Sequence, residues 1–293
     1  MSSPLEALVQ RYAPKNLQDY ENALKEILQE LVLVGLARTD FFNRAAFYGG
    51  TALRIFHGLS RFSEDLDFTL LDRDPSFSLQ SYFGAVRESL NAFGLVAEIE
   101  EVQKRLATTI ESAFLKSNTR MHLLQVSGAD RIAQRLTRNK VIRVKFEIDV
   151  QPAVGFQSEV RVMLPPLSAS VRLLNRSSLF AGKLHAVLCR GWGNRVKGRD
   201  FYDMLWYVGQ KVPVYLPYLQ AKMVEGGQWD AGEVLTRDAL LSLLQSRFEA
   251  VDFIGAAAEV SPFLHDAAEV GVWSKEFFSR AVDSLLVEEL AHC

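Results

Sequence analysis

The sequence predicts an α+β fold, with a mixed β-sheet flanked by helices and a mostly helical C-terminal part. Two observations predict the sheet, because apolar and polar residues alternate along 64–70 and again along 141–150. A third predicts the helices: apolar residues recur every three or four positions along 17–34, and this period returns from residue 177 onward. We divide the chain into a core with N-terminal helices, residues 1–210, and a helical C-terminal domain, residues 211–293.

The composition indicates an ordinary globular protein. The 293 residues are 48% hydrophobic and 23% charged, which excludes a disordered chain and a disulfide-rich miniprotein. Cys189 and Cys293 cannot build a disulfide framework, so we expect a reducing, cytoplasmic setting. The N-terminus lacks the apolar core of a signal peptide, and no run approaches the roughly 18 apolar residues of a membrane span. We therefore expect a soluble cytoplasmic protein with no membrane contact.

The net charge of −2 hides a basic middle third. Residues 104–200 carry 18 Lys and Arg against 6 Asp and Glu, whereas both flanks are acidic. Such a block suits contacts with the phosphates of a folded RNA, and its few aromatic residues argue against a stacking platform for single strands. In the alternative interpretation, many of these cations pair with the acidic flanks.

The expected elements follow the apolar pattern. Asn16 is a plausible N-cap for the long helix, and Gly49-Gly50 form a tight turn between a short strand and a helix. A glycine-rich basic loop, 191–199, is a candidate mobile segment that closes on a nucleotide or an RNA. We expect helices at 17–34, 51–57, 78–93, from 177 and from about 200, and strands at 46–48, 64–70, 95–102, 121–126, 141–150 and 161–164.

Two carboxylates mark the candidate site. Asp65 and Asp67 lie two residues apart on a predicted strand, so both side chains point the same way and can hold one cation or bridge two. The Gly49-Gly50 turn places backbone N–H groups at a helix N-terminus, which suits triphosphate oxygens. Mg²⁺ prefers one or two carboxylates plus substrate phosphates. These parts together predict metal-assisted phosphoryl or nucleotidyl transfer.

A neighbouring strand offers a third carboxylate. Asp149 would complete a two-metal site and help to deprotonate the attacking hydroxyl, and Glu147 on the same face is the alternative. The other interpretation is a solvated strand face on which these acids balance Arg143 and Lys145.

Several motifs, in order, carry a resemblance that covers about residues 47–207. The stretch YGGTALRIFHGLSRFSEDLDF, then AGKLHAVL, then KGRDFYDML resembles the signature of the AbiEii-type abortive-infection toxins. These belong to the nucleotidyltransferase superfamily related to DNA polymerase β. The matching positions are Gly49, Gly50, Thr51, Arg61, Ser63, Asp65, Asp67, Lys183, Arg199, Asp200 and Asp203.

The resemblance implies the toxin of a type IV toxin–antitoxin system that acts in phage defence. Such a toxin would be a nucleotidyltransferase with Mg²⁺ as cofactor and an NTP as substrate, and some relatives modify the 3′ acceptor end of tRNA. A nucleotidyltransferase core, a tRNA or other RNA acceptor and a cognate antitoxin protein are therefore expected.

The site residues follow from the two arguments together. The residue pattern assigns Asp65, Asp67 and Asp149 to the metal, and the resemblance adds Lys183 and Asp200 as catalytic residues. The resemblance assigns the nucleotide to a set of residues shared by the turn and the two downstream motifs: Gly49, Gly50, Thr51, Arg61, Ser63, Lys183, Arg199 and Asp203.

Alternatives stay open at this stage. Asp203 rather than Asp200 could complete the site, since both can face it on a helix. Lys183 could merely extend from an apolar helix to solvent. Ser63 could cap a turn, or block the nucleotide if it were phosphorylated. The acceptor could be a small molecule or a protein hydroxyl, and the chain could also be a non-catalytic nucleotide-binding module.

Overall fold

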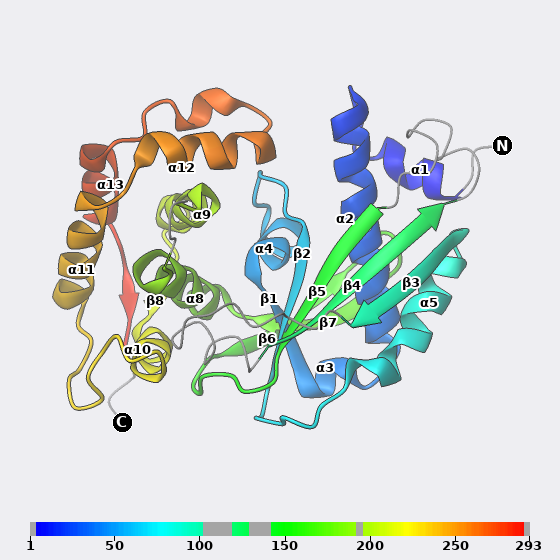
Figure 1. Cartoon of the computed structure of the whole chain (residues 1–293), viewed down its shortest axis with the longest axis horizontal. Helices are drawn as coiled ribbons and strands as arrows, with labels where there is room; N and C mark the ends of the chain where they lie inside the picture. Colours follow the sequence, from blue (N-terminus) through cyan, green and yellow to red (C-terminus); the bar gives the residue numbers. More distant parts are fainter. Residues whose placement is uncertain (1–3, 102–118, 129–141, 192–195, 290–293) are drawn as a thin grey trace. The chain divides into compact units, whose positions relative to one another are not determined.

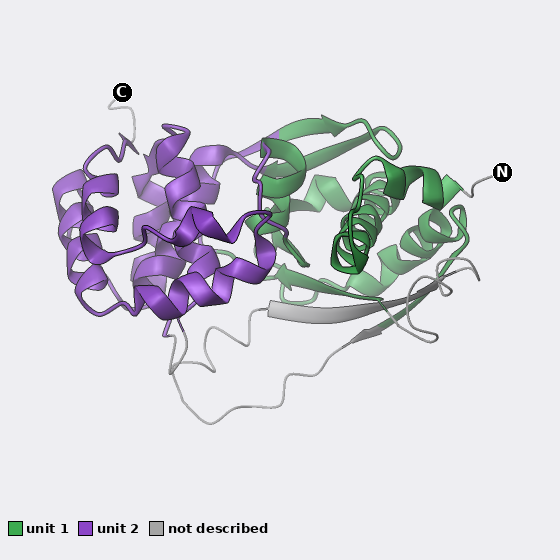
Figure 2. Ribbon diagram, turned by 90° about the horizontal axis from the view of Figure 1, so that it is seen from above, with its two compact units in different colours: residues 1–57, 63–152, 160–173 green, residues 58–62, 153–159, 174–293 purple. Residues whose placement is uncertain are grey.

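The computed structural model describes residues 4–101, 119–128, 142–191 and 196–289. The chain forms two compact units, and each is discontinuous in sequence (Figure 2). The first unit contains residues 1–57, 63–152 and 160–173, and the second contains residues 58–62, 153–159 and 174–293.

A mixed sheet organises the first unit, as the sequence predicts, and it has seven strands (Figure 1). β2 pairs antiparallel with β1 and parallel with β5, so β2 lies between two strands that are distant in sequence. The strand order is β3-β4-β5-β2-β1-β7-β6. The strands are β1 (Ala45–Tyr48), β2 (Asp65–Leu70), β3 (Leu95–Glu101), β4 (Thr119–Gly128), β5 (Ile142–Asp149), β6 (Ser158–Met163) and β7 (Ala169–Leu174). β7, which pairs parallel with β1, is absent from the predicted elements.

The helices of the first unit lie mainly in its N-terminal part. The long predicted helix is confirmed, and the side chain of Asn16 accepts a hydrogen bond from the amide of Asp19 at 2.9 Å. The predicted helix 78–93 is split into a 3₁₀ turn and a shorter α-helix. The elements are α1 (Pro4–Gln10), α2 (Leu17–Ala37), α3 (Phe41–Arg44), α4 (Gly49–His57), η1 (Leu79–Tyr82) and α5 (Phe83–Asn91).

One face of the sheet packs into the core and the other carries polar side chains. Leu66 and Phe68 of β2 are fully buried, and Phe68 stacks on Phe146 of β5 with ring centroids 4.7 Å apart. Helix α2 contacts β5 and α5 (Figure 1). Because the apolar residues of β2 and β5 alternate with polar ones, this burial directs Asp65 and Asp67 to the opposite face.

The second unit is mostly helical. An aromatic cluster forms its core, in which Phe253 stacks on Phe278 at 4.6 Å and Phe201 meets Phe278 edge-on at 5.5 Å. The elements are α8 (Arg176–Cys189), α9 (Gly198–Gly209), β8 (Val214–Tyr215), α10 (Leu216–Glu225), α11 (Arg237–Glu249), α12 (Phe253–Val260), η2 (Ser261–Phe263), η3 (Ala267–Val270), α13 (Lys275–Val282) and β9 (Val287–Glu288).

The division between the units differs from the predicted one at residue 211. Helices α8 and α9 pack against α10, α11, α12 and α13, so the longest segment of the second unit begins at Leu174. The sequence pattern does not reveal this, because the helical period begins at residue 177 without a linker at the change.

Within the described ranges, no helix is both long and apolar enough to cross a membrane.

A buried acid lies where α1 meets α2. The hydroxyl of Tyr12 donates to Oε1 of Glu30 at 3.4 Å, and Arg11 lies 3.8 Å from the same oxygen. Oε2 of Glu30 has no hydrogen-bond partner among the described residues. Burial raises the pKa of Glu30 to about 7, and the charge of Arg11 opposes this only in part.

We therefore predict that Glu30 makes the folded chain less stable as the pH rises. Its folded pKa exceeds its ordinary value of 4.5, so its carboxyl favours the folded state at low pH and loses this effect between pH 4.5 and about 7. Glu30→Gln should therefore raise the free energy of unfolding, relative to the wild type, by about 3 kcal/mol more at pH 8 than at pH 4.5. Urea unfolding would measure this, with the exposed Glu88→Gln as control, and an equal effect at both pH values would contradict it.

Candidate active site

Pairing of the strands brings acidic residues together on the polar face of the sheet. β2 and β5 run parallel, with Asp65 beside Lys145, Asp67 beside Glu147 and Thr69 beside Asp149. Glu147 is therefore the direct neighbour of Asp67, whereas Asp149 lies two residues further along β5. The register thus favours Glu147, the alternative third carboxylate, and the role of Asp149 stays a prediction. Oδ1 of Asp149 accepts a hydrogen bond from the amide of Gln151 at 3.0 Å.

Lys145 is a cation within this acidic face. Its Nζ lies 2.6 Å from Oε1 of Glu147. Partial burial acts to lower the pKa of Lys145, but the hydrogen bond to Glu147 and the charges of Glu147, Asp65 and Asp67 raise it above its ordinary value. From the sequence alone, Lys145 is expected only to balance acidic charge on a solvated strand face. The structure contains the Lys145–Glu147 ion pair, and the strand register places this pair beside Asp65 and Asp67.

The glycine turn fits tightly against Asp67. Tyr48, the last residue of β1, pairs with Asp67, and Gly49 then turns the chain with a φ of 82°. A Cβ atom at Gly49 would lie 2.3 Å from Oδ2 of Asp67. Only glycine combines this left-handed backbone with so close an approach. The N-terminus of α4 therefore begins beside the carboxylate, and its partial positive charge favours anions there.

Helix α4 begins at Gly49, two residues earlier than predicted. Thr51 thus lies in its first turn, is fully buried, and donates its hydroxyl to the backbone carbonyl of Asp65. Thr51, which the resemblance assigns to the triphosphate, thus holds the first residue of β2 in place. Gly50 is half-buried in the same turn.

Helix α2 anchors the two residues before β2. The side chain of Gln29 donates to the carbonyl of Ser63 at 3.1 Å, and Nζ of Lys25 lies 2.7 Å from Oε1 of Glu64. Gln29 is fully buried. These contacts hold the backbone of Ser63 in the first unit, and no sequence pattern singles out Lys25 or Gln29 for this role.

In the second unit, Lys183 is clamped between two acids. Its Nζ lies 2.8 Å from Oδ1 of Asp200 and 2.8 Å from Oδ2 of Asp203. The Lys183 side chain is only 15% exposed, so the alternative that it extends into solvent is wrong. Burial acts to lower the pKa of Lys183, yet the two carboxylates raise it above its ordinary value. Lys183 is therefore a fixed ammonium ion.

Each of the two acids has a second cationic partner. Asp200 accepts a hydrogen bond from Nη1 of Arg190 at 2.7 Å, and Asp203 accepts two from Arg61, both at 2.6 Å. Burial acts to raise the pKa of both carboxyls, but Lys183 and these arginines lower it below the ordinary value. Arg190 is missing from the predicted site; it lies seven residues after Lys183, at the C-cap of α8.

Arg199 is also engaged within the second unit. It lies 3.4 Å from Oε1 of Glu259, and its guanidinium lies over the ring of Phe263, 4.3 Å from the centroid. The interpretation that basic residues pair with acids is therefore confirmed for Lys183 and Arg199, whose partners include Asp203 and Glu259 of the acidic C-terminal flank. Eight of the 18 basic residues of the middle third lie outside the described residues, as does part of the 191–199 loop.

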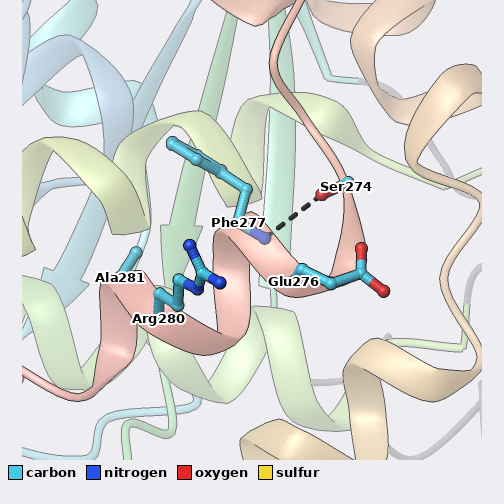
Figure 3. Close-up of a pocket in the computed structure, with 5 residues that line it drawn as sticks. All are labelled: Ser274, Glu276, Phe277, Arg280 and Ala281. Atoms are coloured by element: carbon cyan, nitrogen blue, oxygen red, sulfur yellow. Dashed lines mark hydrogen bonds between the residues drawn. The ribbon is translucent and has the colours of Figure 1, made fainter.

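The predicted residues thus form two sets. The first unit contains Gly49, Gly50, Thr51, Ser63, Asp65, Asp67 and Asp149. The second unit contains Arg61, Lys183, Arg199, Asp200 and Asp203. A surface pocket on the second unit, around the start of α13, contains none of them (Figure 3). Ser274, Glu276, Phe277, Arg280 and Ala281 line it.

Among the described residues, no group of three or more His, Cys, Asp or Glu side chains has the arrangement of a metal site. This does not conflict with the acidic pair, because Mg²⁺ is often held by one or two carboxylates plus the phosphates of a substrate. Asp65 and Asp67 share a face and have that donor chemistry.

A family model described as "Nucleotidyl transferase AbiEii toxin, Type IV TA system" matches residues 31–278, most of the chain. The chain belongs to the AbiEii family of type IV toxin–antitoxin nucleotidyltransferases. The acidic pair, the glycine turn and the Lys183 cluster all lie within the matched span, and as a member of the AbiEii family the chain is a nucleotidyltransferase.

Solved structures show the same fold. JHP933 from Helicobacter pylori is 20% identical, with a TM-score of 0.52 over 89% of this chain and 93% of that one. MenT4, a nucleotidyltransferase toxin from Mycobacterium tuberculosis, is 16% identical, with a TM-score of 0.51 over 94% of this chain and 93% of that one. No curated protein matches the chain. At these identities, the solved structures establish the α+β fold of the AbiEii chain and nothing finer.

We predict that Gly49→Ala reduces the nucleotidyltransferase activity of this AbiEii chain by about 10²-fold, because displacing reacting groups by about 1 Å costs that much. The added Cβ would meet the Asp67 carboxylate, and the left-handed backbone would strain any other residue. Steady-state kinetics would measure the loss. Gly84→Ala is the control, since a Cβ there meets nothing within 4 Å. Full activity of Gly49→Ala would show that the close approach is not required.

Proposed function

We propose that the chain transfers a nucleoside monophosphate from an NTP, with Mg²⁺, to an RNA acceptor, the 3′ end of tRNA, and so blocks translation and growth. The observation that carries the proposal is the contact between the glycine turn and the acidic pair. Gly49 brings the N-terminus of α4 beside the Asp67 carboxylate. A triphosphate needs both features, a cation held by carboxylates and backbone N–H donors for its oxygens.

Asp65 and Asp67 would hold Mg²⁺, since their half-buried carboxylates share one face of β2. Bound there, Mg²⁺ would neutralise phosphate charge and so favour displacement at phosphorus. The pleat of β2 keeps the two acids on one face, and the hydrogen bond from Thr51 to the Asp65 carbonyl fixes where β2 begins. Positioning of this kind is a main source of rate in phosphoryl-type transfers.

In the proposed reaction, the oxygen of a 3′-hydroxyl forms a bond to the α-phosphorus of the NTP, and the bond to the β-phosphate oxygen breaks. Pyrophosphate leaves. Asp149, or its alternative Glu147, accepts the proton of the hydroxyl. Lys183 supplies a fixed positive charge to the phosphates, as the family resemblance implies, and the N-terminal amides of α4 donate hydrogen bonds to them.

The basic middle third supports RNA as the acceptor. It holds 18 Lys and Arg against 6 acids, enough for several phosphate contacts. Among its described members, Lys145, Lys183, Arg190 and Arg199 are ion-paired with acids. RNA contacts would therefore depend more on the other basic residues of the block. A cognate antitoxin and a cytoplasmic location are proposed on the family alone.

We predict that Asp65→Asn and Asp67→Asn each abolish transfer without unfolding the chain, because an amide keeps the shape but loses the charge that holds the metal. Incubation with each radiolabelled NTP and total tRNA, followed by gel analysis of the RNA, would measure the transfer. Asp72→Asn, an exposed acid just beyond β2, is the matched control and should keep full activity. An active Asp65→Asn or Asp67→Asn variant would refute the assigned metal role.

We predict that RNA binding weakens steeply with salt. Each phosphate contact contributes about −0.7 to −0.9 to the slope of log affinity against log salt, so several contacts should give a slope of −3 or steeper. Fluorescence anisotropy with labelled tRNA would measure it. A small-molecule or protein acceptor instead predicts a negligible slope and label outside the RNA. Nucleotide binding without release of pyrophosphate would indicate a non-catalytic module.

A further inference from the structure

We propose that Arg61 and Asp203 do not contact the nucleotide but are positioning residues that hold the ammonium group of Lys183. The inference rests on the proposed function, in which Lys183 binds phosphates. The family resemblance places all three residues in the nucleotide-binding set, but their surroundings in the second unit separate them.

The side chain of Arg61 is buried in the protein interior. Its side chain is 3% exposed, and its Nε and Nη2 atoms donate to the two oxygens of Asp203 at 2.6 Å each. Its Nη1 donates to the carbonyl of Phe62 at 2.8 Å. Each of the three guanidinium nitrogens thus has a protein acceptor, and the side chain has almost no exposed surface with which to reach a substrate.

Asp203 is more deeply buried than Arg61. Its side chain is 0% exposed, its Oδ1 accepts from Arg61, and its Oδ2 accepts from Arg61 and lies 2.8 Å from Nζ of Lys183. A carboxylate without exposed surface cannot bind a nucleotide or a metal unless the unit rearranges. Its remaining role is structural: Arg61 holds the Asp203 carboxylate in place, and that carboxylate holds the ammonium group of Lys183.

Lys183 differs from both because part of its side chain is exposed. Two of its three N–H donors are directed to Asp200 and Asp203, at 2.8 Å each, and this fixes the direction of the third. The charged groups around it are Asp200, Asp203 and Arg61. Asp200 is the outer acid, since its other partner, Arg190, has a side chain that is 43% exposed.

The segment that carries Arg61 is held on both sides. The hydroxyls of Ser60 and Tyr202 lie 2.7 Å apart, and the amide of Phe62 donates to the carbonyl of Phe263 at 2.9 Å. Arg61 therefore has a fixed backbone as well as a fixed side chain. A rigid support of this kind is what a positioning role requires.

The test is a double-mutant cycle on kcat/KM for the NTP, with Asp203→Asn, Lys183→Gln and the double variant. If Asp203 acts through Lys183, Asp203→Asn should cost tenfold or more in the wild-type background, within the roughly 10²-fold that misplacement can cost. In the Lys183→Gln background it should cost less than about threefold, because coupled residues are not additive. An equal loss in both backgrounds would mean that Asp203 contacts the nucleotide or metal itself, and would overturn the proposal.

A second readout needs no catalysis. The pH profile of Lys183 labelling by reductive methylation, followed by mass spectrometry, should move to lower pH in Asp203→Asn, because an acid that favours the ammonium form is lost. The exposed Asp238→Asn in the same unit is the control and should leave the profile unchanged. An unmoved profile in Asp203→Asn would overturn the proposal. If the profile moves while the wild-type chain transfers no nucleotide, the proposed function fails and the positioning of Lys183 stands.

Arg61→Lys provides the same cycle if Asp203→Asn does not fold. A lysine keeps the buried positive charge but loses the bidentate geometry of the guanidinium. It should lower kcat/KM in the wild-type background and have little further effect in the Lys183→Gln background. An equal loss in both backgrounds, in a variant whose circular dichroism matches that of the wild type, would again overturn the proposal.

Discussion

The approach of Gly49 to the Asp67 carboxylate is the constraint on which the acidic face depends. A side chain at position 49 would place its Cβ 2.3 Å from Oδ2 of Asp67. Because glycine has no Cβ, the turn between β1 and α4 can lie directly against β2. The same turn places Thr51 where its hydroxyl reaches the carbonyl of Asp65. One left-handed residue thus fixes both the start of α4 and the start of β2, and with them the directions of Asp65 and Asp67.

The two units differ in how far their charged side chains are buried. On the sheet, Asp65, Asp67, Glu147 and Lys145 are half-buried and keep access to water. In the second unit, Asp203 and Arg61 are withdrawn from water, and each is stabilised by the other through a bidentate contact. Breaking such a buried pair is costly because the remaining charge has no solvent to stabilise it.

The sequence predicts most of this fold because its strongest patterns are local. The alternation along β2 and β5 and the Asn16 cap of α2 depend only on neighbouring residues, and all were predicted correctly. The choice between Glu147 and Asp149 depends on strand register, which alternation alone cannot supply. The partners of Lys183 depend on how α8 packs against α9, so an apolar helix with one lysine suggests a solvent-facing side chain until Asp200 and Asp203 are seen beside it. Strand β7 was missed for a similar reason, since its pairing with β1 joins residues far apart in sequence.

The short segment 58–62 has a consequence for how the chain can be divided. It lies in sequence between α4 and β2, yet it belongs to the second unit, and the chain passes between the two units five times. A fragment that begins at residue 174 would therefore contain Asp203 but lack Arg61, leaving a buried carboxylate without its main partner. The helical unit is thus incomplete as a contiguous piece of polypeptide. An exchange of C-terminal halves between related toxins would have to transfer this five-residue insert as well.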